Sequence, residues 1–190
     1  MHATSDVVTL HSRAAADAQR VVDNVQTEDL SQSTPCSEWD VQTVLQHVIT
    51  LNQAAARQEE SPADPTPVPR QHDANVVADF AAATRAASVA FSAPGAMEQT
   101  FTMPWGETKG EALAQVLAMD LMIHAWDVAK ATGQATDMLD PELCQTALEM
   151  GQAMMTDAYR TPEGVFGPEV SVPADAPICD RMAAFYGRQP

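Results

Sequence analysis

The chain has 190 residues, and its 26 acidic side chains outnumber its 10 lysines and arginines, which gives a formal charge of −16. This length is enough for one ordinary domain with its own apolar core, so we expect a single domain over residues 1–190. Nucleic acid and anionic lipid would be repelled by most of this surface, which argues against both as partners.

The N-terminus and the cysteines add further exclusions. No run approaches the ~18 consecutive apolar residues of a membrane span, and Met1-His-Ala-Thr-Ser-Asp6 lacks the pattern of a signal peptide, which predicts a cytoplasmic protein. Cys36, Cys144 and Cys179 form no Cys-x-x-Cys pair, so neither a disulfide framework nor a thiolate zinc site is indicated. A homodimer is the default oligomer to expect.

Apolar residues at helical spacing predict a series of helices, taken here in chain order. The first covers about 7–26 and the second about 41–60, with Ser37 or Asp40 placed to cap the second. Residues 61–69 contain four prolines, which remove backbone donors and predict an extended surface connection.

A third helix opens at Asp73 or Asn75 and is stopped by Pro94-Gly95. Residues 97–105 alternate partly between apolar and polar positions, which predicts a short extended segment before a turn at Gly106.

The fourth helix has the clearest boundaries in the sequence. Thr108-x-x-Glu111 has the spacing of a capping box, and Gly133 is a natural C-terminal stop. Asp140-Pro141 then opens a fifth helix that runs to about Tyr159.

The last part of the chain predicts an irregular segment and one short helix. Residues 161–177 hold four prolines, and a helix from Ile178 to about Tyr186 follows, with Gly187 as its stop. The predicted fold class is therefore all-α: a four-helix bundle with an extra short C-terminal helix and an irregular, proline-rich C-terminal segment.

Two polar residues interrupt the apolar face of the fourth helix. Asp120 and His124 fall in the same stripe as Leu113 and Leu121, so both side chains point toward the core. Burying an unpaired carboxylate is costly, and residues four apart on one helix face can hold a common partner. A divalent metal ion explains this pair, and His47, at the edge of the apolar face of the second helix, can supply a third ligand.

The motifs also resemble those of a known family. In chain order they are Thr34-Pro-Cys-Ser-Glu-Trp-Asp-Val41 followed by His47, Met103-Pro-Trp-Gly106, Asp120-x-x-x-His-Ala-Trp-Asp127, Ala131-Thr-Gly133, Phe166-Gly-Pro168 and Gly187-Arg-Gln-Pro190. Together they are similar to the N-terminal metal-binding domain of mycothiol-dependent maleylpyruvate isomerase, in the DinB-like superfamily of metal-binding four-helix bundles. The resemblance covers nearly the whole chain. It implies a DinB-like bundle with His47, Asp120 and His124 as metal ligands, and Asp120 stands where the isomerase has a glutamate.

Two imidazoles and one carboxylate leave coordination positions open, as in a catalytic zinc site, and a coordinated thiol is deprotonated. We therefore expect a metal-dependent S-transferase or isomerase that uses mycothiol or a related small thiol against a small electrophile. The resemblance favours zinc, while nickel, manganese and iron stay open because these ligands do not distinguish them. The alternative function is a non-catalytic metal-binding or protein-interaction module.

Other residues have less specific interpretations. Asp127 either orients a ligand histidine or, as an exposed residue near a helix end, makes a local hydrogen bond or a surface pair, with the exposed position favoured. Packing is favoured over pocket roles for the tryptophans, and inert filling over a metal contact for Cys36. We expect packing positions for Trp39, Trp105 and Trp126, solvated helix faces for Arg57 and Arg85, surface positions for His2, His11 and His72, and core positions for Met150, Met154 and Met155.

Overall fold

The computed structural model describes residues 2–57, 75–103, 105–156, 160 and 166–190. Within these ranges the chain forms six α-helices and one short hairpin: α1 (His2–Val22), α2 (Val41–Arg57), α3 (Val76–Phe91), β1 (Thr100–Met103), β2 (Gly106–Lys109), α4 (Gly110–Ala131), α5 (Pro141–Met154) and α6 (Ile178–Phe185). Two short 3-10 turns lie at Thr27–Asp29 and Thr136–Met138.

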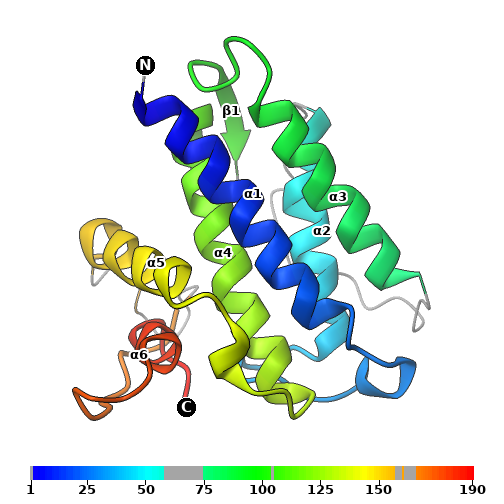
Figure 1. The fold of residues 1–190 in the computed structure, drawn as a ribbon, viewed down its shortest axis with the longest axis vertical. Coiled ribbons are helices and arrows are strands. Elements are labelled where there is room, and N and C mark those ends of the chain that lie inside the picture. The colour runs from blue at the N-terminus through cyan, green and yellow to red at the C-terminus, as the bar shows by residue number, and fades with distance from the viewer. Residues whose placement is uncertain (1, 58–74, 104, 157–159, 161–165) are drawn as a thin grey trace.

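The first four helices form a bundle, as predicted from the sequence. α1 packs against α4 and α3, and α2 packs against α3 and α4. In Figure 1, α1 and α4 run downward while α2 and α3 run upward. Two neighbouring helices that point the same way need a long connection between them, and residues 58–74 separate α2 from α3.

The core is filled by the apolar faces of these helices. α1 contributes small side chains, including Ala14 and Ala18, so its backbone approaches α4 closely. α4 contributes Leu117, Leu121 and Trp126, which are almost completely buried. A fully buried side chain of this size contributes about 2 kcal/mol, so the bundle has a substantial core of its own.

α4 is buried along most of its length. By length and composition it could cross a membrane, but 78% of its most apolar 18-residue window lies inside the fold. This burial is the property expected of the central helix of a bundle.

α5 and α6 pack against each other and against one side of α4, outside the bundle (Figure 1). Gly151 in α5 leaves room for the Tyr186 ring, because a Cβ at this position would collide with that side chain. The Tyr186 hydroxyl donates to the carbonyl oxygen of Ala147 at 2.7 Å. Trp126 donates from Nε1 to Asp180 Oδ1 at 2.9 Å, which ties α4 to α6.

Two aspartates cap helices as the sequence predicts. Asp40, and not Ser37, caps α2, since its Oδ1 accepts from the backbone N–H of Thr43 at 2.8 Å. The Asp140 side chain accepts from the backbone N–H groups of Glu142 and Leu143 at the start of α5.

The predicted capping box at Thr108 is wrong. Thr108 lies in β2, which pairs antiparallel with β1 so that Met103 faces Gly106. The residue before α4 is Lys109, and its side chain makes no capping hydrogen bond. The Thr108 hydroxyl instead accepts from Nε1 of Trp105 at 3.0 Å. The extended segment predicted before Gly106 is thus one arm of a hairpin, whose second strand occupies the residues assigned to the cap.

Some helix ends also differ from their predictions. α1 begins at His2 and ends at Val22, four residues before the predicted end at Gln26. α5 ends at Met154, because Met155 has extended backbone, and the remainder of its predicted range to 159 lies largely outside the described residues. Met154 is exposed, so its predicted core position is wrong, whereas Met150 and Met155 pack against the core.

His11 is the clearest error among the surface predictions. Its side chain is completely buried between α1, α2 and α3, where its Nδ1 lies 2.9 Å from Ser88 Oγ and its Nε2 lies 3.1 Å from Asn52 Oδ1. The Phe91 ring packs against it in an edge-to-face arrangement, with the two ring centroids 5.1 Å apart. Burial lowers the pKa of His11 to about 4, although the hydrogen bond with Asn52 works in the other direction.

This burial predicts a loss of stability in acid. Between pH 6.5 and 4 the unfolded chain takes up a proton on His11 and the folded chain does not, so lowering the pH through this window should lower the free energy of unfolding by about 3 kcal/mol. Urea unfolding of chelator-treated protein at the two pH values measures the change.

The control variant is His11→Leu. It should be less stable at neutral pH, because Asn52 and Ser88 lose a hydrogen-bond partner, yet its stability should change less across the same window. Equal losses in the wild type and the variant would contradict the assignment to His11.

Candidate metal centre

The structure brings the three predicted ligands together from two helices. His47 comes from α2, and Asp120 and His124 come from successive turns of α4. Asp120 Oδ1 lies 3.3 Å from His47 Nε2 and 3.3 Å from His124 Nε2. One ligand-type atom from each residue lies within 4.8 Å of the others, and the two imidazole rings are 5.0 Å apart.

The electrostatics of the cluster follow from its burial and from its opposite charges. Burial by itself would raise the pKa of Asp120, but His124 and His47 outweigh it and hold that pKa well below its ordinary value. Burial would lower the pKa of His124, but the carboxylates of Asp120 and Asp127 raise it to about 9. Two carboxylates thus favour positive charge at this place in the core.

The donor atoms fit a divalent cation. Both Nε2 atoms face the same carboxylate oxygen, while the buried atoms His47 Nδ1 and Asp120 Oδ2 have no hydrogen-bond partner among the described residues. A buried polar atom without a protein partner is costly, and Asp120 Oδ2, which belongs to a candidate ligand, is the kind of atom that a bound ion would satisfy. Two imidazoles and one carboxylate are common ligands of zinc and other first-row metals.

A short loop before α2 holds Trp39 over the centre. The Trp39 ring lies 4.9 Å from the His47 ring and 5.9 Å from the His124 ring. The Thr34 hydroxyl builds this loop by donating to the carbonyl oxygen of Trp39 at 2.9 Å and accepting from the backbone N–H of Cys36 at 3.1 Å. Glu38 within it has a positive φ of 67°, a strained conformation for a residue with a side chain.

The other two tryptophans lie away from the centre. Trp126 is fully buried and bonded to Asp180, so its predicted packing role agrees with the structure. Trp105 lies at the hairpin and is 47% exposed, so its predicted packing position is wrong. Only Trp39 contacts the candidate ligands, and neither periodicity nor composition distinguished it from the others.

Asp127 is completely buried, so the favoured prediction of an exposed position is wrong. Its Oδ2 lies 3.0 Å from Nδ1 of His124, and both of its oxygens accept hydrogen bonds from Arg188. The less favoured prediction, in which Asp127 orients a ligand histidine, is the one that agrees with this geometry. Arg188 belongs to the Gly187-Arg-Gln-Pro190 motif, but the sequence does not predict its contact with Asp127.

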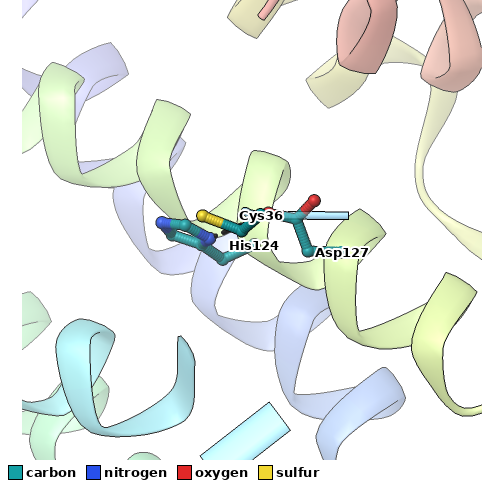
Figure 2. A group of neighbouring side chains, drawn as sticks. All are labelled: Cys36, His124 and Asp127. Carbon is teal, nitrogen blue, oxygen red and sulfur yellow. Dashed lines mark hydrogen bonds and ion pairs between the residues drawn. The ribbon is translucent and has the colours of Figure 1, made fainter. Parts of the chain in front are cut away.

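Cys36 lies beside this hydrogen bond. Its Sγ, one ring nitrogen of His124 and one carboxylate oxygen of Asp127 lie within 4.8 Å of one another, and Figure 2 shows the three side chains together. Burial raises the pKa of the Cys36 thiol to about 11, although the Arg188 guanidinium acts in the opposite direction. A protonated thiol is a poor nucleophile. These three side chains could also hold a metal ion, so both the inert role and the metal contact of Cys36 stay predictions.

The remaining candidates lie elsewhere. Arg57 and Arg85 are exposed on α2 and α3, as predicted for solvated helix faces. The side chain of His2 and the whole of His72 lie outside the described part of the chain.

Comparisons with known proteins connect this geometry to a family. Residues 11–129, more than half of the chain, match the mycothiol maleylpyruvate isomerase N-terminal domain. The chain belongs to this family. The resemblance inferred from the motifs is therefore confirmed, and the residues matched include the three candidate ligands and Asp127.

Relatives include two uncharacterized proteins of Mycobacterium tuberculosis, one from strain CDC 1551 / Oshkosh and one from strain H37Rv. Each is 38% identical over 183 residues, which covers 96% of this chain and 98% of the relative. Among solved structures, the crystal structure of the mycothiol-dependent maleylpyruvate isomerase aligns with 75% of this chain and 67% of its own, with 16% identity and a TM-score of 0.46.

The ligand geometry predicts the effect of single substitutions. We expect about one equivalent of divalent metal per chain, and a strong loss of bound metal in His47→Ala, Asp120→Ala and His124→Ala, because two remaining donors hold an ion much less tightly than three. Elemental analysis after zinc loading and desalting measures the metal content. Asp137→Ala removes an exposed carboxylate and should retain full occupancy. Full occupancy in all three ligand variants would place the site elsewhere.

Chelation should destabilise the fold without unfolding it. A ligand that binds only the folded state adds about 2.7 kcal/mol at 100 times its Kd, so removal of the metal should lower the Tm by several degrees. The bundle should persist because its apolar core is independent of the centre. Calorimetry with and without chelator measures the shift, and complete unfolding on chelation would indicate a structural metal instead.

Proposed function

We propose that this protein binds one divalent metal ion at His47, Asp120 and His124 and uses it to activate a small thiol for an S-transferase or isomerase reaction. The observation that carries the proposal is the convergence of two Nε2 atoms on Asp120 Oδ1, within a chain that belongs to the isomerase domain family. Zinc is the proposed ion and mycothiol the proposed thiol, both on the basis of family membership.

All three ligand side chains are largely buried: His47 and His124 are 10% and 8% exposed, and Asp120 is 19% exposed. The Oδ2 atom of Asp120 is itself buried and has no hydrogen-bond partner among the described residues. The donor atoms thus lie in a region of low dielectric, where their attraction for a cation is strong.

The chain's own residues would hold and shield the reacting groups. A divalent cation held by His47, Asp120 and His124 would lower the pKa of a thiol bound to it and so favour the thiolate near neutral pH. Trp39 covers the imidazole rings and keeps water away from one side of the centre, which strengthens electrostatic interactions there. Asp127 holds the His124 ring in one orientation through Nδ1.

Thiol binding gives a direct test. With cobalt in place of zinc, a small thiol should produce a thiolate-to-metal charge-transfer absorption that grows as the pH rises through the lowered pKa of the bound thiol. Mycothiol should bind more tightly than a simple thiol, because its sugar and carboxylate groups add contacts that a single sulfur atom does not. Absorption titrations with both thiols measure the two affinities.

Asp120→Ala, which removes the carboxylate ligand, should abolish the absorption together with cobalt binding, while Asp137→Ala should retain both. A wild-type protein that binds cobalt fully but shows no spectral change with any thiol would argue against thiol activation. A non-catalytic metal-binding module would then be the better account. Turnover in a thiol-conjugation assay would support the enzyme.

A further inference from the structure

The geometry points to Arg188 as a positioning residue of the metal centre. Arg188 follows α6, and its side chain donates hydrogen bonds to Asp127 and to Tyr186 rather than to any of the three candidate ligands. Arg188 holds Asp127, and Asp127 holds the ring of His124. The affinity of the centre for metal would therefore depend on the C-terminal end of the chain. This inference rests on the proposed metal site.

The chain reverses direction after α6 so that Arg188 returns to the bundle. Gly187 has a positive φ of 85°, and its N–H donates to the carbonyl oxygen of Ala184 at 3.0 Å. The N–H of Arg188 donates to the carbonyl oxygen of Ala183 at 3.0 Å, which completes a glycine-terminated helix end. Gly187 also packs on Gly167, where a Cβ would come within 2.8 Å of the Cα of Gly167. Both its conformation and this close contact require glycine.

Each of the three nitrogens of the Arg188 guanidinium donates a hydrogen bond. Its Nε donates to Asp127 Oδ1 at 3.2 Å and its Nη2 donates to Asp127 Oδ2 at 3.0 Å, a two-point pairing with the carboxylate. Its Nη1 donates to the carbonyl oxygen of Tyr186 at 2.9 Å. Arg188 is 5% exposed and Asp127 is fully buried, so the guanidinium is not free to bind a substrate anion.

One oxygen joins the arginine to the histidine. Asp127 Oδ2 accepts from Arg188 and also lies 3.0 Å from His124 Nδ1, where a ring N–H can donate to it. With Nδ1 donating to Asp127, a ring that gives up its second proton on binding a cation would have its lone pair on Nε2, the atom that faces Asp120. Without Arg188, the buried Asp127 carboxylate would lose its compensating charge and its fixed orientation, and His124 would lose its support.

A purely structural role explains this arrangement less well. Replacing both members of a buried ion pair with apolar residues is often neutral or stabilising, so stability alone is a weak reason for such a pair. Here the pair contacts a candidate metal ligand, and partners of metal-bound histidines set the orientation and basicity of the ring. We therefore assign Arg188 to the centre rather than only to the packing of α6.

The test compares Arg188→Gln with Arg181→Gln, which makes the same change at an exposed position of α6. Competition with a chromophoric chelator measures the zinc affinity of each folded protein. We expect Arg188→Gln to weaken zinc binding 10- to 100-fold and Arg181→Gln to leave it unchanged. Arg188→Lys should recover part of the loss, because lysine supplies the charge but not the two-point pairing.

A second measurement does not require metal. In 15N-edited NMR spectra of chelator-treated protein, the proton on His124 Nδ1 should exchange slowly with solvent in the wild type and in Arg181→Gln, and rapidly in Arg188→Gln. Should Arg188→Gln fail to fold, the double variant Asp127→Asn/Arg188→Met removes both buried charges, and the same loss of affinity and of proton protection is expected.

The outcomes separate this inference from the proposed function. Unchanged zinc affinity and an unchanged Nδ1 proton in a folded Arg188 variant would overturn the positioning role. A wild-type protein that binds no zinc would overturn the proposed function, and the proton measurement would still decide whether Arg188 fixes the ring.

Discussion

The carboxylate of Asp120, set between the imidazoles of His47 and His124, is the interaction on which the rest of the site depends. Its Oδ1 lies 3.3 Å from the Nε2 atoms of both rings, inside the apolar interface between α2 and α4. Polar groups in this position are unfavourable unless they have partners, because the low dielectric of the core raises the free-energy cost of a charge that is buried without one. Asp127 is such a partner on the far side of the His124 ring, and a cation would be one for the two Nε2 atoms and the carboxylate.

The elements around the bundle are arranged to support this buried group. The loop before α2 places Trp39 against the rings, and its strained Glu38 shows that the loop conformation is held by surrounding contacts. On the opposite side of His124, Asp127 and Arg188 continue the polar chain from α4 to the residue after Gly187. α5 and α6 pack outside the bundle and carry this end of the chain back to α4. The short C-terminal helix is thus more than an addition to a four-helix fold.

Family membership and the geometry of three side chains both support the proposed metal centre. A match to the isomerase N-terminal domain over residues 11–129 places α4 and its two candidate ligands in a domain type named for a thiol-dependent enzyme. The alignment with the 38% identical relatives covers 96% of this chain, so the sequence similarity to them extends beyond residues 11–129, the part that the family model matches. The three ligand-type side chains, and not the fold alone, carry the functional argument.

Periodicity was sufficient to predict the presence and order of the helices, since helix formation follows local patterns of apolar residues. Capping residues predicted the starts of α2 and α5 but not that of α4. Periodicity was also sufficient to predict the pair on α4, because residues four apart on one helix necessarily share a face. Local spacing predicted neither the second strand of the hairpin nor the burial of His11, which depends on α1, α2 and α3 meeting. Likewise, Arg188 and Asp127 are 61 positions apart, and no pattern in the sequence joins them. Only the tertiary structure decides such contacts, because they arise from the packing of whole elements and not from the order of neighbouring residues.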